Sequence, residues 1–156
     1  MARDLNIQKY VWFTGRISDT DARRYLSTVA VCVQPDPLNP LNDKSTMNKV
    51  MEYMALGKPL VAFDLVETRV SAGKAGVFAK PNDELEFARK VCQLLDDPRQ
   101  ALCMGAAGRE RVVKHLSWEH SVPHLLRAYA DGLGMPAQRS KGAAPEAVGF
   151  DAARKV

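Results

Sequence analysis

The chain has 156 residues, of which 46% are hydrophobic and 26% charged, so it can bury one hydrophobic core as a globular domain does. The net charge of +4 is small, and the sequence has no basic stripe with interleaved aromatic residues, which argues against a nucleic-acid-binding protein. No apolar run approaches the ~18 residues that span a bilayer, and the N-terminus lacks the apolar stretch of a signal peptide.

The cysteines and the distribution of charge indicate the compartment. The three cysteines form no C-x-x-C pair, which disfavours a disulfide framework or a zinc site and favours a reducing, cytoplasmic location. We expect Cys32, in an apolar run, and Cys92, on the apolar face of a helix, to be buried. Four Lys and Arg residues lie between positions 139 and 155, and this positive surplus also suits peripheral contact with anionic lipids at the inner membrane face.

Strand-like and helical patterns alternate from the start of the chain. Residues 10–14 are apolar and β-prone, and they predict a first strand that ends at Gly15. Ser18 can cap a helix that runs to about Thr28. Acidic residues in the first turn also favour this helix start through the helix dipole. Residues 30–33 are a continuous apolar run, typical of a strand that is buried on both faces of a parallel sheet.

The next segment predicts a loop, a helix and a strand. Residues 34–43 are rich in proline and asparagine, which is typical of a loop. A helix is expected to begin at Ser45 or Thr46 and to end at Gly57, which takes the usual position after a helix C-terminus. Residues 59–63 predict the next buried strand.

The remainder is mainly helical. Residues 66–71 predict a short helix, and residues 76–79 predict a last strand. Three capped helices follow, beginning at Asn82 or Asp83, at Asp97 before Pro98, and at Ser117, and ending near Leu95, His115 and Leu133. Residues 135–156 have no periodicity, so we expect a disordered tail after a single domain over residues 1–134.

The order of these elements predicts the fold class. Strands that alternate with helices form crossover units, so we expect an α/β fold: a three-layer, Rossmann-like parallel sheet with helices on both faces. In such sheets ligands bind beyond the carboxyl ends of the strands. The loop over residues 34–43 follows such an end and leads into a helix start, which makes this the expected place for a functional site.

Two readings of this helix start are open. A helix start exposes unpaired N–H groups that can hold a phosphate, and Ser45 and Thr46 add hydroxyl donors while Lys44 and Lys49 add charge. The same residues also fit an ordinary capped helix start at the surface. Glu52, one turn further on, could accept hydrogen bonds from the two hydroxyls of a ribose, or it could be a solvated residue with good helix propensity.

Other motifs in the sequence give weaker evidence for a functional site. The sequence has neither a P-loop nor a G-x-G-x-x-G motif, and Gly105 and Gly108 fall within a helical pattern, where we expect them to allow close helix packing. His120 and His124 lie four residues apart, but the acid of an H-E-x-x-H motif is absent and Pro123 intervenes. We therefore expect no metal site.

Residues 48–62 read N-K-V-M-E-Y-M-A-L-G-K-P-L-V-A, which resembles the signature of the family 4 (group 1) retaining glycosyltransferases of GT-B architecture. That signature is an acid, seven residues, and then E-A-M-A-x-G-x-P-V-V-A. Further stretches resemble the family in the same order, at residues 11–15, 30–35, 73–81, 97–98 and 117–119. The resemblance covers residues 8–133 and identifies the chain as similar to the C-terminal, donor-binding domain.

The resemblance implies roles for particular residues. Glu52 would hold the ribose of a nucleotide-diphosphate sugar, and the backbone amides of residues 45–47, beside Lys44, would hold its diphosphate. The turn of Gly15, Arg16 and Ile17 would lie beside the nucleobase. The binding positions thus implied are Gly15, Arg16, Ile17, Lys44, Ser45, Thr46, Met47 and Glu52. The implied reaction transfers a sugar to an unknown acceptor with retained configuration, without a cofactor or a metal.

Two departures from the family pattern leave alternatives open. The first acid of the signature falls at Lys44, and the adjacent Asp43 could replace it after a loop shift. The family's Arg and Lys that neutralise the leaving diphosphate precede the strand expected at residues 10–14. We therefore expect an N-terminally truncated chain that lacks the acceptor domain, contains no catalytic residue and is inactive alone. A non-catalytic nucleotide- or protein-binding module is the alternative, and a different nucleotide-diphosphate enzyme, such as an epimerase, is a third.

Overall fold

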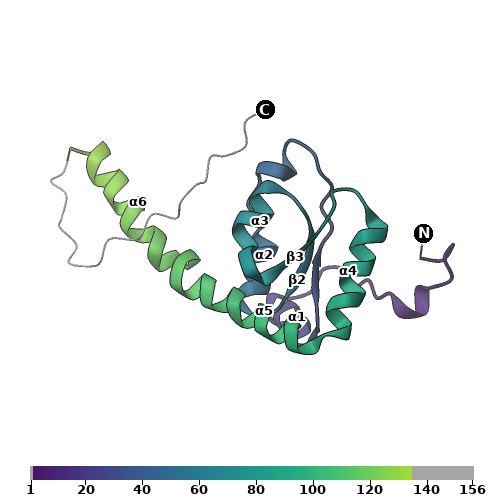
Figure 1. Cartoon of the computed structure of the whole chain (residues 1–156). Helices are drawn as coiled ribbons and strands as arrows, with labels where there is room; N and C mark the ends of the chain where they lie inside the picture. The colour runs from purple at the N-terminus through teal and green to yellow at the C-terminus, as the bar shows by residue number, and fades with distance from the viewer. Residues whose placement is uncertain (1, 135–156) are drawn as a thin grey trace. The chain divides into compact units, whose positions relative to one another are not determined.

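The computed structural model describes residues 2–134, so the tail expected over residues 135–156 lies outside the described part (Figure 1). The chain divides into two compact units, Met1–Leu116 and Ser117–Val156. The first unit contains the sheet and its helices, and the second contains α6, Trp118–Gly132. Across residues 2–134, no helix combines the length and the apolar character needed to cross a membrane.

The first unit is built on a parallel sheet. Among the described residues, the sheet has three strands in the order β1 (Cys32–Gln34), β2 (Leu60–Phe63) and β3 (Gly76–Ala79). Val33 of β1 lies opposite Val61 of β2, which in turn lies opposite Val77 of β3. The strands overlap the apolar runs that predicted them, and all neighbouring pairs are parallel, as crossover connections require. The expected burial of the first strand on both faces is wrong, because Val33 of β1 is 41% exposed.

Helices cover both faces of this sheet. They are α1 (Asp19–Thr28), α2 (Asn48–Ala55), α3 (Val66–Ala72), α4 (Glu84–Asp96) and α5 (Pro98–Arg111). Leu60 and Ala62 of β2 belong to one core, together with side chains of α1, α2 and α3. Val61 and Phe63 point the other way, into a second core with side chains of α4 and α5. Figure 1 shows α2 and α3 on one side of the strands and α4 on the other. The predicted α/β class, a sheet between two helix layers, is confirmed.

Glycine positions fix how closely α5 approaches α2. A Cβ on Gly105 would lie 2.0 Å from the carbonyl oxygen of Gly57, and a Cβ on Gly108 would lie 2.8 Å from Cβ of Ala75. Gly57 itself has a φ of +67° and follows the last turn of α2. The expected packing roles of Gly105 and Gly108 and the helix end at Gly57 are therefore confirmed.

Three cations close the C-terminal ends of helices on this framework. Lys58 donates from Nζ to the carbonyl oxygens of Ser27 and Val29, at 2.7 and 3.0 Å, at the end of α1. Arg109 donates to the carbonyl oxygen of Ala55 in α2 at 3.0 Å. Arg111 donates to the carbonyl oxygens of Val70 and Ser71 in α3, at 2.9 and 3.0 Å. Because the last carbonyls of a helix lack partners and carry partial negative charge, each contact supports its helix.

The strand predicted over residues 10–14 is wrong. Gln8–Tyr10 form a 3-10 turn, and the following residues carry no strand pairing, with Trp12 and Phe13 exposed to 92% and 83%. Val11 does have extended backbone, with φ −119° and ψ 123°, so the local preference was read correctly. A strand, however, also needs a neighbour to complete its hydrogen-bond ladder, and that partner is set by the fold rather than by local sequence.

The cysteine predictions were half right. Cys32 is buried at 4% exposure in the core beneath α2, and burial raises the pKa of its thiol to about 11 despite the charge of Lys58. Cys92 is exposed, because α4 packs through Phe87, Val91 and Leu94, and Cys92 lies about 100° around the helix from Val91.

Candidate functional site

The segment between β1 and α2 lies at the carboxyl end of the sheet. Asn42–Lys44 form a 3-10 turn, Ser45 is extended, and α2 begins at Asn48. The helix start expected at Ser45 or Thr46 is therefore wrong by two to three residues. Both hydroxyls bind elsewhere: Ser45 donates from Oγ to the carbonyl oxygen of Leu41 at 2.6 Å, and Thr46 donates from Oγ1 to Oε1 of Glu67 at 2.8 Å.

The N-terminus of α2 has no side-chain cap. Met47 occupies the N-cap position and has no oxygen that could accept from the first turn, which also contains no acidic residue. Among the described residues, nothing accepts from the backbone N–H groups of Asn48 and Lys49. Such N–H groups carry the positive end of the helix dipole, so α2 offers an anion two unpaired donors at its start.

Contacts from α3 fasten this segment. Asp43 accepts at Oδ1 from the backbone N–H of Val66 at 2.9 Å, and Glu67 accepts from Thr46 and also from Oγ of Ser71 at 3.2 Å. Asp43 therefore caps the first turn of α3. The loop shift that would bring Asp43 to the position of Lys44 would have to break this bond.

Glu52 lies on the solvent-exposed side of α2, four residues after its first residue. The rise along the helix between these two positions is about 6 Å. The neighbouring Tyr53 makes a long contact of 3.5 Å from its hydroxyl to the carbonyl oxygen of Val33. Burial raises the pKa of Tyr53, and the charges of Cys32, Glu52 and Asp36 raise it further. Glu52 and Asp36 thus both contribute negative charge near the Tyr53 hydroxyl, which lies by the end of β1.

An ion pair that the sequence did not reveal lies beside Glu52. Lys49 in the first turn of α2 donates from Nζ to Oδ2 of Asp36 at 2.5 Å. Gln34, the last residue of β1, donates from Nε2 to the same oxygen at 2.8 Å and is fully buried. The one available signal was position, because an acid two residues after a buried strand lies at the carboxyl edge of the sheet.

The structure places the turn of Gly15, Arg16 and Ile17 at the start of α1. All three residues are exposed, and the other end of α1 is anchored by Lys58, about 15 Å away along a ten-residue helix. Ile17 lines a hollow of about 400 Å³ with Asp21, Arg24, Tyr25 and Thr28. Among the described residues, no hydrogen bond or ion pair links this turn to Glu52 or to the start of α2.

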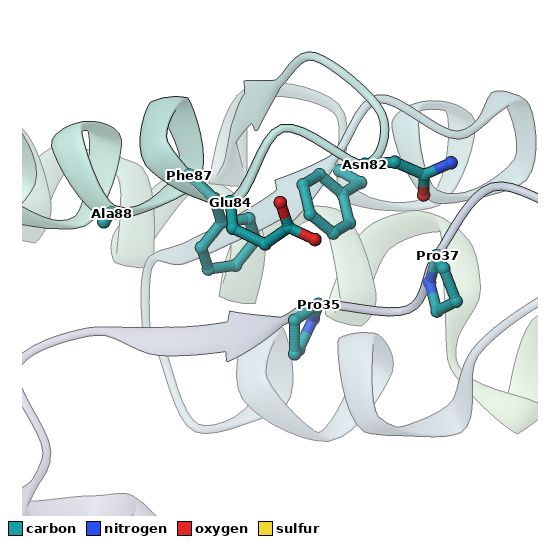
Figure 2. A pocket seen from close by; sticks show the side chains of 7 residues that line it. Pro35, Pro37, Asn82, Glu84, Phe87 and Ala88 are labelled. Carbon is teal, nitrogen blue, oxygen red and sulfur yellow. The ribbon is translucent and has the colours of Figure 1, made fainter. Parts of the chain in front are cut away.

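A separate pocket of about 350 Å³ opens on the other face of the sheet (Figure 2). It is lined by Pro35, Pro37, Phe63, Asn82, Glu84, Phe87 and Ala88. Figure 2 shows the Glu84 side chain extending over this space from the start of α4. Phe63 and Phe87 pack edge to face with ring centroids 5.0 Å apart, and no cation lines the pocket. An apolar pocket with one carboxylate does not suit a phosphate.

Within the described residues, no group of three or more His, Cys, Asp and Glu side chains is arranged to hold a metal ion. The residues that gather at the carboxyl end of β1 are instead unpaired N–H donors, cations and one exposed acid. A parallel sheet between helix layers, with an open helix start at its carboxyl edge, defines a three-layer α/β protein of the kind that binds ligands at that edge.

The comparisons with known proteins agree with this fold class and also identify a family within it. Residues 1–97 match the family described as "Glycosyl transferases group 1". The chain belongs to the group 1 glycosyltransferases, and its α/β unit corresponds to the C-terminal domain of their GT-B architecture.

Curated relatives and a solved structure support the assignment. The chain is 34% identical over 96 residues to a D-inositol 3-phosphate glycosyltransferase of Thermobifida fusca, covering 60% of this chain and 22% of that protein. It is 30% identical over 126 residues to an alpha-maltose-1-phosphate synthase of Mycolicibacterium smegmatis, covering 76% and 31%. Its fold matches a sucrose-phosphate synthase from Thermosynechococcus elongatus with a TM-score of 0.76 at 26% identity, covering 85% of this chain and 33% of that one. The chain therefore spans between a fifth and a third of the length of these proteins.

Proposed function

We propose that this chain supplies the donor-binding half of a retaining glycosyltransferase that uses a nucleotide-diphosphate sugar. The observation that carries the proposal is the uncapped N-terminus of α2, where Met47 replaces a capping residue and the N–H groups of Asn48 and Lys49 have no described acceptor. An anionic diphosphate would satisfy both donors and would interact favourably with the helix dipole.

The ribose would bind to Glu52. Glu52 is exposed, and its backbone position lies about 6 Å along α2 from the first residue of the helix, on the scale that separates a ribose from its phosphates. Lys44 lies exposed just before the helix and would add positive charge beside the diphosphate. The hollow lined by Ile17, next to Gly15 and Arg16, is the proposed location of the nucleobase.

The catalytic contribution of this half would be positioning and charge stabilisation. As the bond to the sugar breaks, negative charge grows on the departing diphosphate, and the preorganised N–H groups of α2 would stabilise it without having to reorient. The names of these relatives all combine sugars with phosphate or with glycosyl transfer, which supports a sugar-transferring role. The acceptor and its binding domain would belong to other parts of the full-length enzyme, and a nucleotide-sugar donor fits a cytoplasmic location.

Calorimetric titration of the chain with UDP, GDP and ADP, beside the Glu52→Ala variant, tests the donor site. We expect selective binding of one diphosphate, weakened about tenfold by the substitution because a charge-assisted pair of hydrogen bonds to the ribose is lost. Glu110, exposed on α5, offers a matched control, since Glu110→Ala removes the same charge away from the proposed site. A well-folded chain that binds none of the three diphosphates would contradict the proposal.

A non-catalytic nucleotide-binding module is the second candidate, and Asp43 favours it. Its carboxylate is bound to the N–H of Val66, so the acid missing at Lys44 is not replaced in this structure. A donor site gains affinity from the sugar, whereas a module without sugar recognition does not. Equal affinities for the preferred diphosphate and for its nucleotide sugars would therefore support the module, and a preference for one nucleotide sugar would support the transferase.

A further inference from the structure

We propose that Lys49 is an additional contact for the donor diphosphate and that Asp36 binds the ammonium group of Lys49 while the ligand is absent. In the ligand-free chain Lys49 is paired with Asp36, and the diphosphate takes the place of Asp36 as the partner of the ammonium group. The inference rests on the proposed function, because it concerns the same helix start. It makes Asp36 a residue that sets the affinity of the site although it touches no ligand.

Lys49 occupies an unusual position for a cation. It is the second residue of α2, in the first turn, where the helix dipole already places partial positive charge and where acidic residues are normally favoured. Glu52 and Tyr53 follow it by three and four residues, so the three side chains share one side of the helix. Lys49 therefore belongs to the same first turns of α2 as the unpaired N–H groups and Glu52.

Asp36 is the partner of this cation in the free chain. Its Oδ2 accepts from Nζ of Lys49 at 2.5 Å and from Nε2 of Gln34 at 2.8 Å. The side chains of Lys49 and Asp36 remain 39% and 27% exposed, so a ligand can reach both. The carboxylate of Asp36 thus accepts from the buried amide of Gln34 on one side and from the partly exposed Lys49 on the other.

Gln34 shows that the cluster is not fully satisfied by the protein. Its side chain is fully buried at the end of β1, yet its Oε1 has no hydrogen-bond partner within the described structure. A buried acceptor without a partner is costly and calls for an explanation. The amide is oriented by its bond to Asp36, so it fixes this carboxylate in place at a cost in unfulfilled hydrogen bonding.

The exchange is favourable on electrostatic grounds. A partly exposed pair such as Lys49–Asp36 is worth little, because water screens it. A diphosphate carries more negative charge than one carboxylate, and it gains the unpaired N–H groups of α2 at the same time. Removal of the charge of Asp36 should therefore strengthen binding, and it should do so only while Lys49 is present.

A double-mutant cycle on the full 156-residue chain tests this, with the tightest-binding of UDP, GDP and ADP as the probe in calorimetry. We expect Lys49→Met to weaken binding about tenfold, and Asp36→Asn, which still accepts from Gln34, to strengthen it about threefold. The double variant should bind within about twofold of Lys49→Met. Glu110→Gln is the matched control, because it removes the same charge from the exposed pair of Glu110, on α5, with Lys114 and should change nothing.

The outcomes separate this inference from the proposed function. Weaker binding by Asp36→Asn, or strengthening that persists in the double variant, overturns the exchange while the donor site stands. Absence of binding by the unsubstituted chain overturns both. Thermal melts check that each variant folds, and Lys49→Arg gives an independent arm: it should retain binding within about threefold, because the charge is kept. Equal losses in Lys49→Arg and Lys49→Met would contradict a charge contact.

Discussion

The first-turn N–H groups of α5 and α2 differ in whether the chain supplies them with an acceptor. Asp97 caps α5 by accepting from the N–H of Gln100 at 2.9 Å, and Pro98 fills the first helical position. At α2 the cap is Met47, and the hydroxyls that could have served bind to other segments. One helix start is closed by its own sequence, and the other is held in place from outside and left open. The difference fits the proposal that the start of α2 is left open for a ligand, at a cost in local stability.

The comparison breaks most severely if the framework that carries both helices is disturbed. In Gly105→Ala the new Cβ would overlap the carbonyl oxygen of Gly57, so we expect a loss of about 3 kcal/mol in the free energy of unfolding. Urea denaturation measures it. Gly132→Ala in α6, with no atom within 4 Å of the new Cβ, is the control and should gain about 0.5 kcal/mol from helix propensity. A similar gain in Gly105→Ala would show that α5 does not need this contact.

Giving α2 the cap that α5 has should exchange binding for stability. Met47 also packs against the core, so Met47→Asp is compared with Met47→Ala, which loses the same packing without gaining an acceptor. Because the new carboxylate could accept from the first-turn N–H groups, the free energy of unfolding should be about 1 kcal/mol higher in Met47→Asp than in Met47→Ala. The same carboxylate would occupy these N–H groups and repel the diphosphate, so diphosphate affinity should fall by about tenfold or more. Denaturation and calorimetry on one preparation measure both. Met47→Leu is the matched control without an oxygen, and an increase in diphosphate affinity for Met47→Asp would refute an open anion site.

Removal of the cap at α5 should affect stability alone. Asp97→Ala leaves the N–H of Gln100 without its acceptor, and we expect a loss of about 1 kcal/mol in the free energy of unfolding. Asp83→Ala, which removes the equivalent bond to the N–H of Glu86 in α4, should cost a similar amount. Diphosphate affinity should be unchanged in both. If either variant loses affinity, the closed helix starts also take part in binding, and the contrast with α2 no longer holds.

Local signals were sufficient for most of the fold. The runs at residues 30–33, 59–63 and 76–79 predicted strands, since short continuous apolar runs between loop residues are typical of a buried parallel sheet, although Val33 of β1 is 41% exposed. Asp97 before Pro98 predicted its helix start because both residues act within one turn. Residues 10–14 carry the same kind of local preference, but a strand also depends on a distant partner, which a local pattern does not contain.

The candidate site was predicted less well, for the same reason. Ser45 and Thr46 look like caps, yet Thr46 binds Glu67, which is 21 residues away in the sequence, so the helix begins only at Asn48. The pairing of Lys49 with Asp36 spans 13 residues and depends on how α2 packs over the end of β1. Whether Glu52 and the start of α2 bind a nucleotide stays a prediction, which the titrations above address.

The smallest expected effect concerns the contact that holds the open start in place. Thr46→Val removes the donor to Glu67 while keeping the shape of the side chain, and we expect a loss of about 0.5 kcal/mol in the free energy of unfolding, because the bond is exposed. Ser45→Ala, which removes a bond within the same loop to Leu41, is the matched comparison. If α3 positions the N–H groups of α2 through Thr46, diphosphate affinity should fall about twofold in Thr46→Val and less in Ser45→Ala. Equal affinities in both variants would mean that the bond of Asp43 to Val66 is sufficient to hold the segment, and the open start would then depend on that single contact from α3.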